Sequence, residues 1–430
     1  MLGEDGAPAG SLLEHVQSHP ESLGSGATAA GDIPFLLKVL SVNIALSIQA
    51  HPDLALAGEL HAARPDLYKD ANHKPEMAVA LGTFEALCGF RPVSELRAHA
   101  AGVPELAAVL GDAAVNGLCS ADAGVAATKA AFGALMTADD ALVKAQLDRL
   151  VARLSAGPDA FNVLSEPLRA LLLRLAEQYP GDAGIFCALV LNYLVLADGE
   201  AIFLPANTPH AYLAGDCVEC MASSDNVVRA GLTPKYRDIG TLLRMLDYAS
   251  SPPDQLVLRG SKDAGSADGV VARTFKPPVN EFLLQVVSVA PGVADVAAEA
   301  VTGPSILIFT AGAADIKGAL MRCRLFLLTV WRRCWKGRRG ARGVFAGADR
   351  DVDHGIGSGR HVPPRILRQL PLGTISSIYR YIILCHCINM VIHTSACIHA
   401  PFHYNIISIH CILTCIEATI SKRLSFPAKN

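Results

Sequence analysis

An Ala- and Leu-rich block with helical spacing interrupts a chain that otherwise carries the pattern of β-strands, and this order limits the possible folds. The strand-like runs are residues 34–52, 77–88, 193–196, 201–204, 282–289 and 305–310. Within the block, residues 91–180, apolar side chains recur at helical spacing, as at Leu168, Leu171 and Leu175. Strands, then helices, then strands predict a mainly β fold with an α insertion: a β-sandwich or barrel core plus an all-helical domain.

Changes in composition predict the domain boundaries. A leader rich in Gly, Ala and Ser covers residues 1–32, and a β core takes residues 33–90 and 181–318. The helical domain occupies residues 91–180 between the two parts of the core. A tail of unrelated composition, residues 319–430, closes the chain, and we expect it to be disordered or aberrant sequence.

The tail contains two unusual runs. Residues 331–342 are rich in Arg and Gly, and residues 381–416 contain no Asp, Glu, Lys or Arg. A nucleic-acid patch and a membrane span are the corresponding functional interpretations. The second run is interrupted by many His and Asn residues, which a hydrocarbon core disfavours, so we expect neither function from the tail.

Charge and cysteine usage exclude further classes. The 430 residues have a formal net charge of -3, which predicts no binding to nucleic acid or to an anionic membrane surface. No apolar run follows Met1, so we expect a cytosolic protein whose 12 cysteines are thiols or ligands rather than disulfides. The Cys217-Val-Glu-Cys220 spacing lacks a second pair at the distance of a zinc module, and buried thiols are the expected state.

Residues with metal-binding and acid–base chemistry gather in three segments: Gln49-Ala-His51, Asn72-His-Lys-Pro-Glu76, and the long run from His210 to Lys235. Gln49 and His51 lie two positions apart in a predicted strand, so their side chains leave the same face about 6.5 Å apart. Such a polar pair is more often a solvated strand face than a metal site. With Glu76 and His210, however, it makes a set of imidazole, carboxylate and amide groups that favours zinc.

These segments resemble the type I phosphomannose isomerases, zinc enzymes that interconvert mannose 6-phosphate and fructose 6-phosphate. The resemblance extends over about residues 30–315. It implies a cupin-like β-barrel or jelly-roll core and one Zn²⁺ per subunit held by Gln49, His51, Glu76 and His210. The family's N-terminal segment, with its Trp-Gly and Gly-Thr-His-Pro motifs, has no counterpart before Asp32, and we expect an incomplete C-terminal barrel.

The resemblance also implies the roles of other residues. The catalytic arginine of the family corresponds to Arg229, to which we assign stabilisation of phosphate or enediolate charge because a guanidinium is not a ready base. Proton transfer between C1 and C2 through a cis-enediol requires a nearby side chain, with Lys74 as first candidate and His73 as second. Lys38, Ser47 and Glu219 are the expected substrate-binding residues. The implied protein is a monomer that acts on a sugar phosphate and supplies mannose for GDP-mannose synthesis.

Two alternatives remain open. A non-catalytic or degraded cupin-like protein that binds a sugar phosphate or a metal would carry the same residues without turnover. The second alternative is a membrane or nucleic-acid function of the tail, which ranks below the isomerase and the non-catalytic protein. Salt-dependent binding of the tail to nucleic acid would distinguish it.

Overall fold

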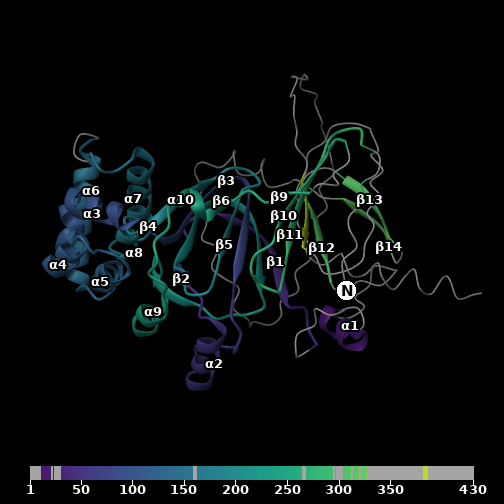
Figure 1. Ribbon diagram of the computed structural model, residues 1–430, viewed down its shortest axis with the longest axis horizontal. Helices are drawn as coiled ribbons and strands as arrows, with labels where there is room; N and C mark the ends of the chain where they lie inside the picture. The colour runs from purple at the N-terminus through teal and green to yellow at the C-terminus, as the bar shows by residue number, and fades with distance from the viewer. Residues whose placement is uncertain are drawn as a thin grey trace, which may run out of the picture.

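The computed structural model describes residues 11–20, 23, 31–157, 162–263, 268–293, 296 and 304–310, and the backbone alone of residues 313–318, 321–326 and 381–385. Figure 1 shows a group of helices at one end, a large β-sheet in the middle and a second sheet beyond it. The helix near the N-terminus lies beside the second sheet. Among the described residues, no helix combines the length and apolarity needed to cross a bilayer.

Ten helices are described. They are α1 (Leu12–Ser18), α2 (Leu54–Ala63), α3 (Val93–Gly102), α4 (Pro104–Cys119), α5 (Val125–Met136), α6 (Asp140–Ser155), α7 (Glu166–Gln178), α8 (Gly184–Cys187), α9 (Ile239–Met245) and α10 (Pro253–Leu256). Helices α3 to α7 form the group at the end of the molecule in Figure 1. Local signals fix their ends, because Asp139 accepts two backbone N–H groups at the start of α6 and a proline opens α4.

Fifteen strands are described. They are β1 (Phe35–Val42), β2 (Ile48–Ala50), β3 (Glu76–Phe90), β4 (Leu191–Leu196), β5 (Ala201–Leu204), β6 (His210–Ala222), β7 (Val228–Gly231), β8 (Val257–Leu258), β9 (Ser261–Lys262), β10 (Val270–Phe275), β11 (Leu284–Val289), β12 (Ile306–Phe309), β13 (Ala313–Gly318), β14 (Met321–Phe326) and β15 (Tyr381–Cys385).

The strands form one large sheet and two smaller ones. The large sheet has the order β7-β2-β6-β3-β5-β8, with β1 also on β6 and β4 also on β3. The second sheet has the order β12-β15-β11-β10-β9, and β13 pairs with β14 alone. Along these described paths the outer strands β7 and β8 do not pair, so the β core is not a closed barrel. This arrangement confirms the predicted fold class, a mainly β core with a helical domain.

The long pair β3 and β6 is strongly curled. Glu76 pairs with Met221 at one end, and Cys88 pairs with His210 at the other. A flat strand rises about 3.3 Å per residue, so Glu76 and His210 would lie roughly 40 Å apart along it. Irregularities of register between residues 80 and 86 bend the pair, and Gly215 there has a φ of +101° and lies so close to Thr83 that a Cβ would be 2.3 Å from its carbonyl oxygen. The bend brings both ends of the pair to one place.

Two of the three apolar cores found among the described residues hold these layers together. One contains the helical domain and its contact with the sheet, where Phe90 of β3 packs on Phe132 of α5 and on Tyr248. The other fills the space between the two sheets, with Phe35 from β1 and Phe275 from β10. Arg174 of α7 adds an ion pair to Glu85 of β3, with nitrogen–oxygen distances of 3.1 and 2.5 Å.

Parts of the predicted leader and tail join this structure. Val16 of α1 is 2% exposed and packs in the core between the sheets, so the leader contributes to the fold. Strand β15 pairs with β11 and β12, and the structure therefore differs from a wholly disordered tail at residues 381–385. The basic run 331–342 and residues 386–416 lie outside the described residues. The domain boundaries remain predictions.

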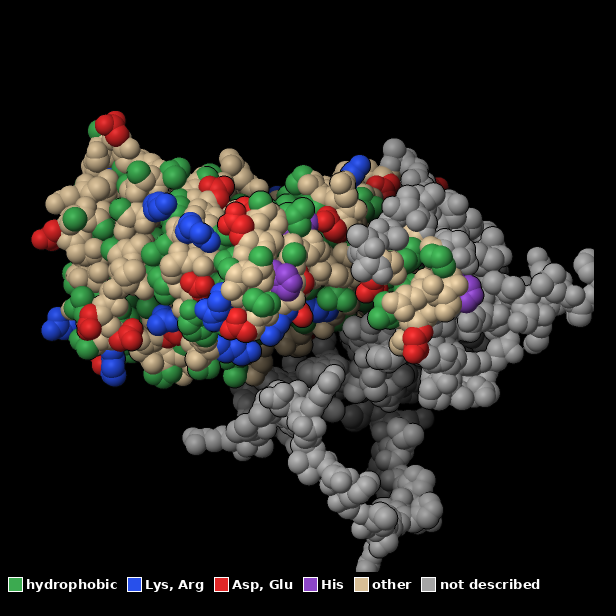
Figure 2. Space-filling model, turned by 90° about the horizontal axis from the view of Figure 1, so that it is seen from below, with side chains coloured by type: hydrophobic (Ala, Val, Ile, Leu, Met, Phe, Trp, Pro, Cys, Tyr) green, Lys and Arg blue, Asp and Glu red, His purple; other side chains and the backbone are tan. Residues whose placement is uncertain are grey.

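Surface charge agrees with the small net charge. In Figure 2, Lys and Arg side chains alternate with Asp and Glu across the coloured part of this face. A mixed surface of this kind gives no extended field of one sign.

Candidate metal centre and its surroundings

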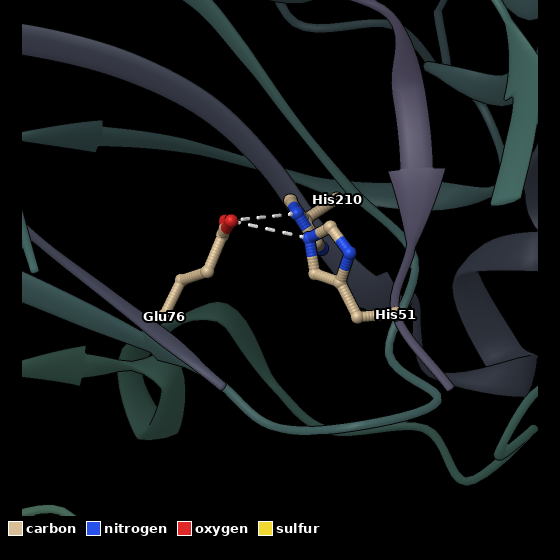
Figure 3. A group of neighbouring side chains, drawn as sticks. All are labelled: His51, Glu76 and His210. Carbon is tan, nitrogen blue, oxygen red and sulfur yellow. Dashed lines mark ion pairs between the residues drawn. The ribbon is translucent and has the colours of Figure 1, made fainter. Parts of the chain in front are cut away.

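The bend of the β3 and β6 pair places three candidate metal ligands in contact. Glu76 begins β3, His210 begins β6, and His51 follows directly after β2. Their ligand atoms all lie within 4.8 Å of one another (Figure 3). The His51 Nε2 to Glu76 Oε1 distance is 3.2 Å, and the His210 Nε2 to Glu76 Oε2 distance is 3.4 Å. All three side chains are buried, with at most 2% exposed.

Backbone carbonyls orient both imidazoles. His51 Nδ1 lies 2.7 Å from the carbonyl oxygen of Asn226, and His210 Nδ1 lies 2.9 Å from that of Thr208. A carbonyl oxygen only accepts, so each Nδ1 carries a proton that it donates, and each Nε2 faces Glu76. This is the orientation that outer partners give to metal-binding histidines.

The facing atoms fit a divalent cation. His51 Nε2, His210 Nε2 and Glu76 Oε2 are buried and have no hydrogen-bond partner in the described part of the chain. Two lone pairs and a carboxylate oxygen repel one another unless a cation or a proton lies among them. Burial lowers the pKa of His51, so its imidazole is neutral at pH 7. The donor set of two nitrogens and an oxygen suits zinc.

Lys74 and Glu76 form a buried ion pair. The Lys74 Nζ to Glu76 Oε1 distance is 3.2 Å, and the lysine side chain is 10% exposed. Burial by itself would raise the pKa of Glu76, but the pKa lies well below its usual value, and the charge of the adjacent Lys74 ammonium helps to lower it. Glu76 is therefore ionised, as a metal-binding carboxylate must be.

Gln49 and Arg229 lie on strands that meet the centre from one side. Gln49 of β2 pairs with His210 of β6 and, on its other edge, with Arg229 of β7. Directly opposed residues of antiparallel strands share a face, so the Gln49 amide lies on the side of the His210 imidazole. The Ser47 Oγ to Gln49 Oε1 distance is 3.5 Å. All four predicted ligands thus belong to one region of the sheet.

Arg229 is a half-buried cation. Burial lowers the pKa of its guanidinium, although an arginine remains charged at pH 7. Within the described residues the guanidinium has no hydrogen-bond or ion-pair partner. A half-buried charge without a partner is suited to receive an anionic ligand.

The predicted substrate residues Lys38 and Glu219 lie opposite each other on β1 and β6. Their Nζ to Oε2 distance is 3.3 Å. Burial and the nearby Glu76 raise the pKa of Glu219, and Lys38 partly opposes this. Tyr212 shares this environment: burial and the carboxylates of Glu219 and Glu76 raise its pKa well above the usual value.

His73 has a partner from the segment that precedes β11 of the second sheet. Its Nε2 lies 2.5 Å from Oε1 of Glu281, which precedes β11. Both side chains are about one-fifth exposed, with values of 23% and 21%. The predicted second candidate for proton transfer is therefore held by a carboxylate rather than free in the site.

Sequence reasoning missed three residues of this region: Tyr212, Asn226 and Glu281. Tyr212 could have been found, because it lies two positions after His210 and so shares its strand face. Asn226 acts through its backbone carbonyl, and Glu281 reaches His73 across 208 positions of sequence. The sequence carries no local signal for these two contacts.

Two family models match the chain. The model described as "Phosphomannose isomerase type I, catalytic domain" matches residues 10–93, and "Phosphomannose isomerase type I, helical insertion domain" matches residues 112–191.

Curated relatives are similar over most of their length. The mannose-6-phosphate isomerase of Bos taurus is 45% identical over 308 residues, which are 70% of this chain and 72% of the relative. The mannose-6-phosphate isomerase of Homo sapiens is 45% identical over 309 residues, again 70% of this chain and 72% of the relative.

Solved structures share the fold. A crystal structure of a mutant of phosphomannose isomerase from Salmonella typhimurium has a TM-score of 0.64 at 29% identity and covers 75% of this chain and 79% of its own. A crystal structure of mannose 6-phosphate isomerase bound with zinc and yttrium has a TM-score of 0.63 at 29% identity and covers 74% of this chain and 78% of its own.

The fold and the site together define a cupin-like β protein with a helical insertion and a buried His-Glu-His cluster ready for a metal ion. The 45% identity to curated relatives over more than two-thirds of their length identifies the family. The chain belongs to the type I phosphomannose isomerases, a family of isomerase enzymes.

Proposed function

We propose that this chain is a zinc-dependent aldose–ketose isomerase that interconverts D-mannose 6-phosphate and D-fructose 6-phosphate through a cis-enediol. The observation that carries this proposal is the buried His51, Glu76 and His210 cluster, whose lone pairs converge where a cation is needed. The names of the relatives and the zinc in a solved neighbour support the substrate and the metal.

One Zn²⁺ is the proposed cofactor, held by Gln49, His51, Glu76 and His210. The three clustered residues supply two nitrogens and a carboxylate oxygen, and the Gln49 amide lies beside His210 on the same face. When bound, zinc would act as a Lewis acid that polarises the sugar's carbonyl and hydroxyl oxygens.

We assign the proton shuttle between C1 and C2 to Lys74, with His73 as the alternative. Lys74 is buried and its ammonium contacts Glu76, so it lies at the centre rather than in solvent. His73 is restrained by Glu281 and is less free to approach the sugar. Proton transfer by a positioned side chain is typically worth about 10²- to 10⁴-fold in rate.

Arg229 supplies fixed positive charge for the phosphate or the enediolate. A phosphate monoester carries about -1.5 to -2 charge at pH 7, and a planar guanidinium binds such a group with two parallel hydrogen bonds. Lys38, Ser47 and Glu219 bind the sugar in this proposal. Lys38 and Glu219 form a pair on the strands next to Glu76, and Ser47 lies against Gln49.

The wider proposal keeps the sequence-based expectations. We infer a monomer with a small sugar phosphate as its partner, and neither nucleic acid nor membrane. We also infer that it acts in the cytosol and that its product feeds GDP-mannose synthesis.

Zinc binding and turnover test the proposal together. The chain, freed of metal and then supplied with zinc, should convert mannose 6-phosphate in a coupled assay that detects fructose 6-phosphate, and a chelator should abolish the conversion. Full turnover in metal-free protein with chelator present would refute the role of zinc. Zinc and sugar-phosphate binding without any turnover would instead support the non-catalytic alternative.

A further inference from the structure

Several hydrogen bonds join the loop that leads into β3 to the turn between β6 and β7, and the carboxylate of Asp70 takes part in those to Ser224, Asp225 and Asn226. We propose that Asp70 is a positioning residue, which sets the orientation of His51 and the placement of the two segments that carry Lys74 and Arg229. This inference rests on the proposed zinc-dependent function.

Asp70 gathers hydrogen bonds from both segments. Its Oδ1 accepts from the backbone N–H of Asn72 at 3.0 Å and from the Ser224 hydroxyl at 2.8 Å, and lies 3.3 Å from Asn226 Nδ2. Its Oδ2 accepts from the backbone N–H of Asp225 at 2.8 Å. The Asn226 amide also donates to the backbone carbonyls of Asp70 and Asn72, at 2.7 and 2.9 Å.

The joined turn acts directly on the candidate metal centre. The carbonyl oxygen of Asn226 accepts the Nδ1 proton of His51 at 2.7 Å, and that bond leaves the His51 Nε2 lone pair towards Glu76. Asn226 is fully buried, at 0% exposed, so water does not replace these contacts. Moving Asn226 would therefore rotate His51 or leave its ring proton unpaired.

The same carboxylate places the catalytic candidates. Lys74 follows Asp70 by four residues on one segment, and Arg229 follows Asn226 by three residues on the other. Asn72, between Asp70 and Lys74, donates its side-chain amide to the backbone carbonyl of Ser223 at 3.1 Å. Asp70 thus fixes the separation of two cationic groups that must contact one substrate.

An amide cannot substitute for this carboxylate. Oδ1 faces the backbone N–H of Asn72, and Oδ2 faces the backbone N–H of Asp225. In Asp70→Asn, either orientation of the amide would point an NH₂ group at one of these fixed donors, which cannot rotate away. The substitution keeps the size of the side chain and breaks the hydrogen bonds by which it connects the two segments.

The test compares Asp70→Asn with Asp66→Asn in the full chain. Asp66 lies four residues earlier on the same loop, is 62% exposed and contacts Arg64 rather than the turn, so it is a matched control. Zinc affinity is measured by competition with a chromophoric chelator, and melting temperature is measured with and without zinc. The values of kcat and KM are measured with mannose 6-phosphate, and the change in kcat is compared with the change in KM.

We expect Asp70→Asn to weaken zinc binding by about 10- to 100-fold, the usual effect of losing an outer partner of a metal-binding histidine. The zinc-induced rise in melting temperature should shrink, and kcat should fall by more than KM rises. Asp66→Asn should match the unmodified chain in all three measurements. A merely structural role would lower both melting temperatures equally and leave zinc affinity unchanged.

Zinc affinity of Asp70→Asn within a factor of two of the unmodified chain would overturn the inference while leaving the proposed function intact. An unmodified chain that binds no zinc would overturn both. Should Asp70→Asn not fold, Ser224→Ala removes a bond to the same carboxylate together with the hydroxyl that accepts the Asn226 backbone N–H, and we expect it to weaken zinc binding by a few-fold. An unchanged affinity in Ser224→Ala would then count against the proposal.

Discussion

Replacing Gly231 with alanine should displace Arg229 without dismantling the metal centre. Gly231 ends β7, two residues after Arg229, and lies against Gly184 of α8. A Cβ at Gly231 would be 2.7 Å from Gly184 Cα and 2.9 Å from Asp182 Oδ1. The backbone of Gly184 cannot rotate away, so β7 itself must move.

The size of the effect follows from these distances. Ordinary carbon contacts begin at 3.4 Å, so β7 must shift by about 0.7 Å to relieve the contact of 2.7 Å. Functional groups tolerate displacements of about 0.5 Å, and a misplacement of about 1 Å can cost roughly 100-fold in rate. We therefore expect kcat to fall by about 10- to 100-fold in Gly231→Ala. Overpacking should cost about 1 to 3 kcal/mol of stability, or a few degrees in melting temperature.

The assay is the coupled production of fructose 6-phosphate, with zinc content measured in parallel. Zinc should remain bound, because His51, Glu76 and His210 lie on other segments than β7, and Gln49 is the one proposed ligand within a strand, β2, that pairs with β7. Gly58→Ala in α2 is the matched control, since a Cβ there meets nothing within 4 Å and alanine favours a helix. A wild-type kcat in Gly231→Ala would refute the reasoning, and equal losses in both variants would show that the effect is not local.

Three further outcomes are expected, each relative to the unmodified chain. His210→Ala should lower zinc affinity by at least about 100-fold, since a ligand contributes more than an outer partner, and unchanged affinity in a chelator competition would contradict its role. Arg229→Lys and Lys74→Met should each lower kcat by about 10²- to 10³-fold with zinc still bound, and near-normal coupled-assay rates would contradict the roles given to them. The hydrogen bond from His73 lowers the pKa of Glu281 below its ordinary value of 4.5, so this contact stabilises the fold above that pH and is lost as pH falls through the lowered pKa. The melting temperature of Glu281→Gln should therefore fall less than that of the unmodified chain between pH 6 and pH 3.5. Parallel curves of melting temperature against pH would exclude the contact.

The sequence by itself determined the elements and the chemistry of the candidate ligands. Apolar periodicity identified the strands around β1, β3 and β5 and the helical block. The strand period of two and the helix period of 3.6 both arise from residues that are close in sequence. The spacing of Gln49 and His51 placed them on one face for the same local reason. Residue type added Glu76 and His210, which lie 134 positions apart in the chain, and the resemblance then implied that all four residues are ligands.

Only the tertiary structure decided how these residues meet. Nothing local to Glu76 or His210 reveals the curl of β3 and β6, which depends on the bend at Gly215 and on the register of the two strands. The carbonyl of Asn226, the carboxylate of Asp70 and the contact of Glu281 with His73 likewise join distant segments. Hydrogen bonds of this kind depend on distance and angle in space, and sequence spacing fixes distance only within a single helix or strand.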